Sequence, residues 1–133
     1  MVQKTVLLAE DDLEIRDILQ DLLEAEGYDV IPASHGRQAL EFLEAALAGR
    51  GKLPDLVMLD VMMPLVDGNE VLASMKRDAR LASIPVVVVS AVADERPAGA
   101  AAFIRKPIPL KKLFETIRDF SESRLAPELV SAT

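Results

Sequence analysis

The sequence predicts one α/β domain built around a parallel β-sheet. Short apolar runs alternate with amphipathic stretches along all 133 residues, as is typical of repeated strand and helix units. Two of these runs, Leu56–Leu59 and Val86–Val89, are apolar at every position, as expected of central strands that helices cover on both faces. The length suits a single hydrophobic core, so one domain is expected.

Five segments are expected to form the strands of this sheet. Each is short and mostly apolar, and each lies between segments with helical or turn-forming sequence. In chain order they are Thr5–Ala9, Tyr28–Pro32, Asp55–Asp60, Pro85–Ser90 and Ala102–Arg105.

Amphipathic helices are expected between the strands. The first follows Asp12, which can cap its start, and a second follows Ser34, which can do the same. Two more are expected over Asn69–Asp78 and Leu110–Arg124. His35 lies near the start of the second helix and is expected to face solvent. The first helix carries apolar residues at helical spacing at Ile15, Ile18, Leu19, Leu22 and Leu23.

The fourth strand and the fifth are joined by a short connection. Between Ser90 and Phe103 the chain contains a proline and a glycine and leaves room for about one or two helical turns. The fourth helix should therefore be abbreviated. Beyond residue 124 little amphipathic pattern remains, so we expect a domain over residues 1–124 and a flexible tail over residues 125–133.

The composition excludes several classes of function. With no cysteine and one histidine, the chain has no disulfide framework, no thiol nucleophile and no cluster of zinc-binding histidines. A net charge of -7 argues against binding to nucleic acid. The apolar run Thr5–Ala9 stops at Glu10 and is too short for a signal peptide or a membrane span, so a cytoplasmic protein is expected.

Polar side chains stand at the carboxyl ends of the predicted strands, where ligands bind in an open parallel sheet. Glu10 and Asp11 follow the first strand, Asp60 ends the third, Ser90 ends the fourth, and Lys106 follows the fifth. Each of them has an ordinary explanation as a helix cap or a turn residue. Matched groups at four strand ends nevertheless favour a site at this edge of the sheet.

These residue types suit phosphoryl chemistry. If the first and third strands are neighbours, three carboxylates converge and repel one another unless a cation neutralises them, and Mg²⁺ prefers such oxygen ligands. Lys106 could then pair with a phosphate oxygen and Ser90 could hydrogen-bond another. Asp60 is the best candidate for a nucleophile that forms an acyl phosphate. No Walker A loop is present, so the phosphoryl donor must be another molecule.

On these residues the chain resembles the receiver domains of two-component response regulators, over roughly residues 4–124. The resemblance implies a flavodoxin-like, doubly wound sheet in the strand order 2-1-3-4-5, with helices on both faces. The matching segments occur in the family's order and are Val6–Asp12 with Arg16, Asp55–Pro64 with Asp67 and Gly68, Ser90 with Ala91, and Gly99–Pro107.

The resemblance also implies a function. Asp60 would accept a phosphoryl group from a histidine kinase or a histidine phosphotransfer protein, and the domain would signal through contact with another protein. Mg²⁺ would be held by Asp11, Asp60 and the backbone carbonyl of Met62, with Glu10 acting through water. The downstream target is open, and the protein would be a monomer or a phosphorylation-dependent homodimer.

Other site residues follow from the same resemblance. Ser90 and Lys106 would hold the phosphoryl oxygens, and the Lys106–Pro107 peptide bond would be cis. Phe103 would be the switch aromatic, which turns inward when Ser90 moves toward the phosphate.

The chain departs from the family pattern at two places. The abbreviated fourth helix means that the family's usual partner surface is not carried over. The positions two residues after Asp60 and Ser90 hold Met62 and Val92, where the family influences hydrolysis of the acyl phosphate. Since two apolar side chains cannot orient an attacking water, slow autodephosphorylation is expected.

Alternative functions use the same residues. The domain could be a phosphorelay intermediate or a phosphate sink, or it could be cut from a hybrid kinase or a larger regulator. A magnesium-dependent phosphatase is disfavoured because those enzymes commonly carry a second Asp where this chain has Met62. A flavin carrier of the same topology is disfavoured because Glu10, Asp11 and Asp12 would repel its phosphate.

Overall fold

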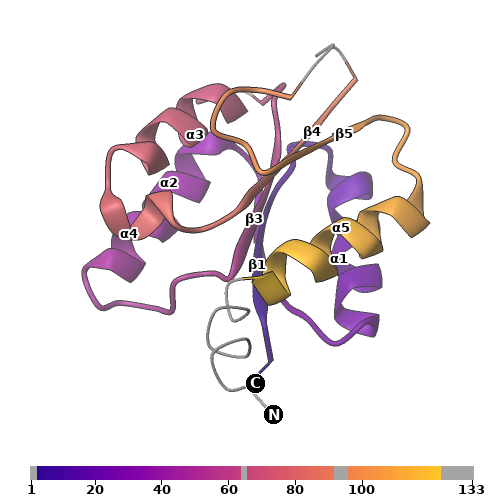
Figure 1. The fold of residues 1–133 in the computed structure, drawn as a ribbon, viewed down its shortest axis with the longest axis horizontal. Helices are drawn as coiled ribbons and strands as arrows, with labels where there is room; N and C mark the ends of the chain where they lie inside the picture. Colours follow the sequence, from indigo (N-terminus) through magenta and orange to yellow (C-terminus); the bar gives the residue numbers. More distant parts are fainter. Residues whose placement is uncertain (1–2, 64–65, 92–95, 124–133) are drawn as a thin grey trace.

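The sheet lies at the centre of the molecule (Figure 1). The computed structural model describes residues 3–63, 66–91 and 96–123, and within them five parallel strands pair in the order β2-β1-β3-β4-β5. This order confirms the one implied by the resemblance. The strands are β1 (Thr5–Ala9), β2 (Asp29–Ala33), β3 (Leu56–Asp60), β4 (Val86–Ser90) and β5 (Ala102–Arg105).

Burial differs between the central strands and the edge strands. Every residue of β1, β3 and β4 is buried, which explains why these segments are almost uniformly apolar. The edge strands β2 and β5 are only partly buried. The polar residues that end β3 and β4, Asp60 and Ser90, are therefore exceptions within a buried apolar sheet.

Helices cover both faces of the sheet, as predicted. In Figure 1, α1 and α5 lie on one face, and α2, α3 and α4 lie on the other. Two buried apolar clusters match these two layers, one containing side chains of α1 and α5 and the other side chains of α2 and α3. The described helices are α1 (Leu13–Ala25), α2 (Gly36–Leu47), α3 (Gly68–Lys76), α4 (Ala79–Ala82) and α5 (Leu110–Ser123).

The third helix was predicted over Asn69–Asp78, but α3 ends two residues earlier, at Lys76, and a short helix that was not predicted, α4, follows it. Asp67 caps α3 in a capping box with Glu70, so that helix begins at Gly68. Asp78 then caps α4, because its Oδ1 accepts the backbone N–H groups of Arg80 at 2.8 Å and Leu81 at 3.3 Å. A residue that caps a new helix has left the preceding one, so α3 ends before it.

The predicted cap of the second helix was also wrong. The side chain of His35, not that of Ser34, accepts the backbone N–H of Gln38, with Nδ1 at 3.1 Å. His35 is half-buried and does not simply face solvent. The helix begins at Gly36, which packs directly on the backbone of Val66: a Cβ atom there would lie 1.8 Å from the carbonyl oxygen.

Smaller differences concern strand ends and connections. The strands β2, β3 and β4 each start one residue later than predicted, and β2 also ends one residue later. The connection between β4 and β5 is described at residues 91 and 96–101, and these contain no helix, in line with the abbreviated helix expected there.

Val92, Pro64 and the tail over 125–133 lie outside the described residues. In the described segments every helix falls short of what a membrane crossing requires in length and apolarity.

Candidate functional site

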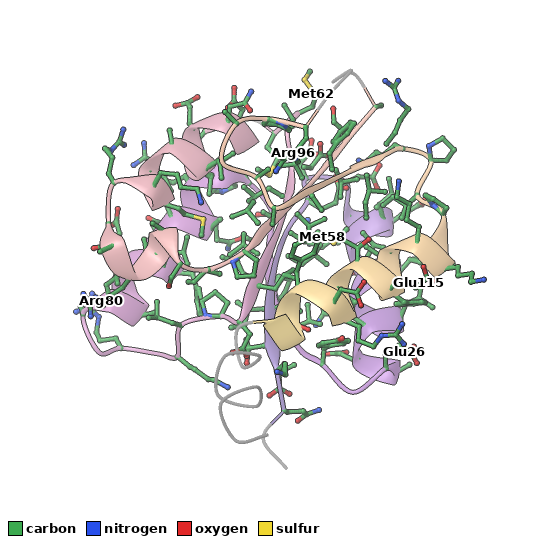
Figure 2. All side chains as sticks on the ribbon, in the orientation of Figure 1. Glu26, Met58, Met62, Arg80, Arg96 and Glu115 are labelled. Carbon is green, nitrogen blue, oxygen red and sulfur yellow. The ribbon has the colours of Figure 1, made fainter. Side chains whose placement is uncertain are left out.

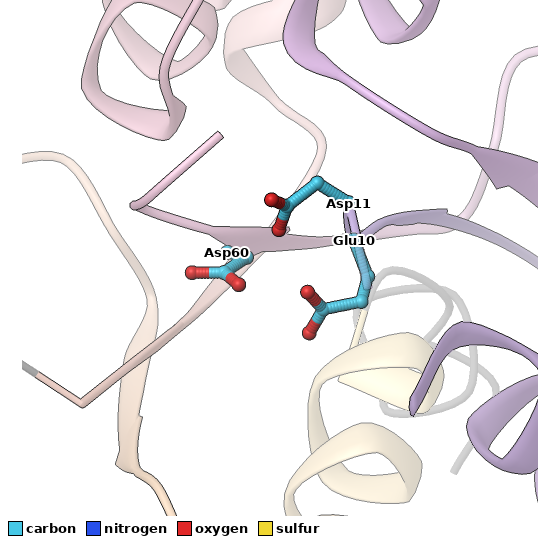
Figure 3. A group of neighbouring side chains, drawn as sticks. All are labelled: Glu10, Asp11 and Asp60. Atoms are coloured by element: carbon cyan, nitrogen blue, oxygen red, sulfur yellow. The ribbon is translucent and has the colours of Figure 1, made fainter. Parts of the chain in front are cut away.

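Three carboxylates meet at the carboxyl end of the sheet. Strands β1 and β3 are neighbours, with Ala9 opposite Leu59, so the residues that follow these partners are brought together. Glu10, Asp11 and Asp60 each place one carboxylate oxygen within 4.8 Å of the other two (Figure 3). Glu10 and Asp60 are 2% and 6% exposed, whereas Asp11 faces solvent.

Lys106 joins two of these carboxylates. Its Nζ lies 2.9 Å from Oε1 of Glu10 and 2.8 Å from Oδ2 of Asp60, with most of the lysine side chain buried. The residue follows β5, and its backbone N–H donates to the carbonyl oxygen of Ser90 at 3.0 Å, which anchors it beside the end of β4. The Lys106–Pro107 peptide bond is cis. Groups from four strand ends therefore meet at one place.

Burial and charge change the acidity of this cluster. Burial, followed by the hydrogen bond and charge of Asp60, raises the pKa of Glu10 to about 7, although Lys106 acts in the opposite direction. Burial alone would lower the pKa of Lys106. Its hydrogen bonds to Asp60 and Glu10 outweigh that effect and raise the pKa above its usual value. The lysine therefore stays protonated and partly neutralises the carboxylates.

Asp60 is held from several directions. The backbone N–H of Met62 donates to Oδ1 at 3.0 Å, so each carboxylate oxygen has a donor, with Lys106 on Oδ2. The first residue of α3, Gly68, presses against the same strand end, because a Cβ there would lie 2.6 Å from the carbonyl oxygen of Asp60. The carboxylate therefore sits on a rigid support, as a reactive group requires.

Glu10 is fixed by the start of α1. Its Oε2 accepts the backbone N–H of Asp12 at 3.2 Å, while Nη1 of Arg16 donates to its backbone carbonyl at 2.9 Å. Asp12 caps α1, as predicted. Arg16 and Gly68 had no predicted role, although both fall within the segments that carry the family resemblance.

The remaining predicted residues lie around this centre. Ser90 is fully buried at the end of β4, and Phe103 lies in β5, where it is partly buried against the apolar cluster on the α2 and α3 side. Met62 is 61% exposed just beyond β3. The roles assigned to these three residues stay predictions.

An apolar groove borders the site and was not predicted. It has a volume of about 480 Å³ and is lined by Ile15, Ile18 and Leu19 of α1 and by Ala91, Lys106, Pro107, Ile108 and Leu110. Ile18 is 58% exposed, although helical spacing places it with the buried residues Leu19 and Leu23. Lys106 lines the groove and contacts the carboxylate cluster, so the two are adjacent.

The carboxylate cluster fits a divalent cation. Mg²⁺ prefers oxygen ligands and is usually held by one or two carboxylates together with water. Glu10, Asp11 and Asp60 offer such oxygens within one small volume, and exposed Asp11 leaves a side of the cluster open to solvent. The donor set contains no soft or aromatic ligand that would favour a transition metal instead.

Comparison with known proteins identifies the family. A family model described as the response regulator receiver domain matches residues 6–118. This chain belongs to that family. Its relatives include the polar-differentiation response regulators DivK of Brucella anthropi and Brucella abortus, each 37% identical over 123 residues that cover 88% of this chain and 95% of theirs.

Solved receiver domains share the fold. The receiver domain of a signal transduction histidine kinase from Syntrophus aciditrophicus is 28% identical with a TM-score of 0.80, covering 90% of this chain and 91% of that one. A CheY-like receiver domain protein from Methanospirillum hungatei is 25% identical with a TM-score of 0.82, covering 95% and 99%. The carboxylate cluster of this receiver domain therefore lies on a fold that response regulators share.

Proposed function

We propose that this receiver domain is a magnesium-dependent switch in which Asp60 accepts a phosphoryl group from a phosphohistidine. The observation that carries the proposal is the setting of Asp60. It is a buried carboxylate at the end of a central strand, and it contacts the ammonium of Lys106 at 2.8 Å beside two further acids. A buried carboxylate that a lysine partly neutralises suits nucleophilic attack better than a structural role at a strand end.

The proposed transfer is a direct displacement. A carboxylate oxygen of Asp60 attacks the phosphorus of the donor phosphohistidine, so that an O–P bond forms while the N–P bond breaks and its electron pair stays on the imidazole. Lys106 can follow the charge from the carboxylate to the phosphoryl oxygens as a mobile point charge. Ser90, buried beside it, would bind another phosphoryl oxygen.

Asp11, Asp60 and the backbone carbonyl of Met62 would hold the metal ion, with Glu10 acting through water. When bound, Mg²⁺ neutralises charge on the phosphoryl oxygens. Glu10 is well placed for an indirect role, because its two oxygens already accept hydrogen bonds from Lys106 and from the backbone of Asp12. Deprotonation of Glu10, whose pKa is about 7, would favour binding of the ion.

The apolar groove supports a protein as the phosphodonor. A donor histidine must come within bonding distance of Asp60. The donor protein must therefore contact the surface around Lys106 and α1. On that surface Ile18 is 58% exposed and Leu110 is 45% exposed, which suits contact with an apolar patch on a histidine kinase or a histidine phosphotransfer protein. Asp17 and Asp21 on the same helix are also exposed and would favour basic residues around that patch.

Output would pass through Ser90 and Phe103 to a protein partner. Phosphorylation adds charge beside Ser90, and movement of that residue would change the packing of partly buried Phe103. A phosphorelay intermediate or a phosphate sink would use the same site. Exposed Met62 offers no carboxylate for acid–base catalysis, so a phosphatase activity gains no support.

Intact mass spectrometry tests the proposal. The protein is incubated with Mg²⁺ and acetyl phosphate and followed over time, beside Asp60→Asn and a sample in EDTA. We expect one added phosphoryl group that persists for many minutes in the wild type and is absent from both controls. Circular dichroism shows whether Asp60→Asn is folded. An equal adduct on Asp60→Asn, or none on folded wild type, would refute the proposal.

A further inference from the structure

Met62 differs from the other methionines that the structure describes. Its side chain is 61% exposed, whereas Met58, Met63 and Met75 are 2%, 8% and 0% exposed. In Figure 2 its sulfur projects from the upper edge of the molecule, while Met58 lies inside. Exposure controls how fast an oxidant reaches a thioether, so this sulfur is the one that a peroxide meets first among the described methionines.

The exposed thioether stands beside the proposed phosphoryl site. Met62 follows Asp60 by two residues, and its backbone N–H donates to Oδ1 of that carboxylate at 3.0 Å. Its unbranched side chain has several rotatable bonds, so it can take up more than one position beside the end of β3. A chemical change at this side chain therefore occurs two residues from the proposed phosphoryl acceptor, on a residue whose backbone contacts its carboxylate.

We propose that Met62 is an oxidation site whose sulfoxide shortens the lifetime of the phosphoryl group on Asp60. The second half of this inference rests on the proposed function. The oxidant is a peroxide, which transfers one oxygen atom to the thioether. The sulfur loses two electrons, the O–O bond breaks, and the second peroxide oxygen leaves as water or an alcohol.

The sulfoxide differs from the thioether in its hydrogen bonding. A thioether sulfur is a weak acceptor, so unmodified Met62 does little to orient a water near the phosphoryl group. A sulfoxide oxygen is polar and can accept a hydrogen bond from a water that attacks phosphorus. In that step an O–P bond forms to the water, the bond between phosphorus and Asp60 breaks, and its electron pair returns to the carboxylate. The water's proton passes to solvent.

The expected effect is moderate. One hydrogen bond to an attacking water changes the rate by about tenfold, because a net hydrogen bond contributes about as much free energy as a factor of ten requires. Methionine sulfoxide reductases can reverse the oxidation, so the effect on the lifetime should also be reversible. A peroxide signal would thereby shorten a phosphorylation signal on the same chain.

Peptide mass mapping tests the site of oxidation. The full-length protein is treated with dilute hydrogen peroxide and digested, and the added oxygen is followed at each methionine over time. Met62 should be oxidised at least tenfold faster than Met58, Met63 and Met75, following their difference in exposure. Oxidation of Met62 at the same rate as the three buried methionines would overturn the proposal. This measurement does not depend on phosphorylation.

The lifetime is measured next, on oxidised and untreated protein. Both are labelled with acetyl phosphate and Mg²⁺, the reagent is removed, and loss of the phosphoryl group is followed by intact mass. We expect decay about tenfold faster in the oxidised protein, restored by treatment with a sulfoxide reductase. Met62→Leu exposed to the same peroxide controls for oxidation elsewhere, and its decay should not respond to the treatment.

The outcomes separate the two proposals. Equal or slower decay in the oxidised wild type, or an equal response of Met62→Leu, would overturn the role of Met62 while leaving Asp60 as the acceptor. Failure of untreated protein to acquire a phosphoryl group would refute the proposed function itself, and the lifetime effect with it.

Discussion

Gly68→Ala should damage the support of Asp60. A Cβ at this position would lie 2.6 Å from the carbonyl oxygen of Asp60 and 2.9 Å from Cα of Val61. The first distance is about 0.8 Å short of the 3.4 Å at which ordinary contact begins, and both neighbours are backbone atoms that cannot rotate away. The start of α3 must therefore move off the end of β3.

The cost can be estimated from these contacts. Overpacking of this kind costs about 1 to 3 kcal/mol, and the better helix propensity of alanine returns up to about 1 kcal/mol. We expect a net loss of about 1 to 2 kcal/mol in the free energy of unfolding, together with slower phosphorylation because the Asp60 backbone shifts.

Urea unfolding followed by circular dichroism measures the first effect, and intact mass with acetyl phosphate measures the second. Asn69→Ala is the matched control, because Asn69 is exposed in the same helical turn and should change stability by less than about 0.5 kcal/mol. If Gly68→Ala proves as stable as Asn69→Ala and is labelled at the wild-type rate, the close approach of α3 to β3 is wrong.

Three further results are expected. The pKa of Glu10 rises from 4.5 in the unfolded chain to about 7 in the fold, so between these values only the folded state holds the proton. In EDTA, the free energy of unfolding of the wild type should therefore fall as pH rises from 4.5 to 7, by at most about 3 kcal/mol relative to Glu10→Gln. Parallel pH profiles of the two proteins in chemical denaturation would contradict this. His35→Ala should lower stability by about 0.5 to 1 kcal/mol and Ser34→Ala by less, and the reverse order in urea melts would restore Ser34 as the cap of α2. Saturating Mg²⁺ should raise the thermal midpoint of the wild type more than that of Asp11→Asn, and equal shifts would remove Asp11 from the metal site.

The sheet was predictable because its central strands are buried on both faces. Val86–Val89 can be apolar at every position only where helices cover both sides, so composition and topology agree there. The bounds of the edge strand β2 were harder to predict because polar and apolar residues mix in its sequence, and the strand lies one residue later than predicted. Local sequence likewise did not reveal the break between α3 and α4, which depends on the side chain of Asp78 turning back onto its own backbone.

The sequence predicted which residues form the site better than it predicted the contacts between them. Residues at the ends of parallel strands share one edge of the sheet, which brings Glu10, Asp60 and Lys106 together. That Lys106 contacts both acids depends on where the chain turns after β5, which no local pattern encodes. The same limit applies to the cap of α2, where the sequence offered both Ser34 and His35 and the structure uses His35.

The exposed groove shows a further limit of periodicity. Helical spacing groups Ile18 with Leu19 and Leu23, yet a helix that packs on only one side leaves part of its apolar stripe uncovered. Which residue stays exposed depends on the position of α5 and of the chain around Pro107. Such information belongs to tertiary packing.

The location of the phosphoryl group tests the central claim most directly. Protein labelled with acetyl phosphate and Mg²⁺ is reduced with borohydride, which converts an aspartyl phosphate to homoserine, and is then digested and sequenced by mass spectrometry. We expect homoserine at position 60, with Asp11 and Glu10 unchanged. Homoserine at position 11 with Asp60 intact, or no conversion in protein that carries the added mass, would contradict it.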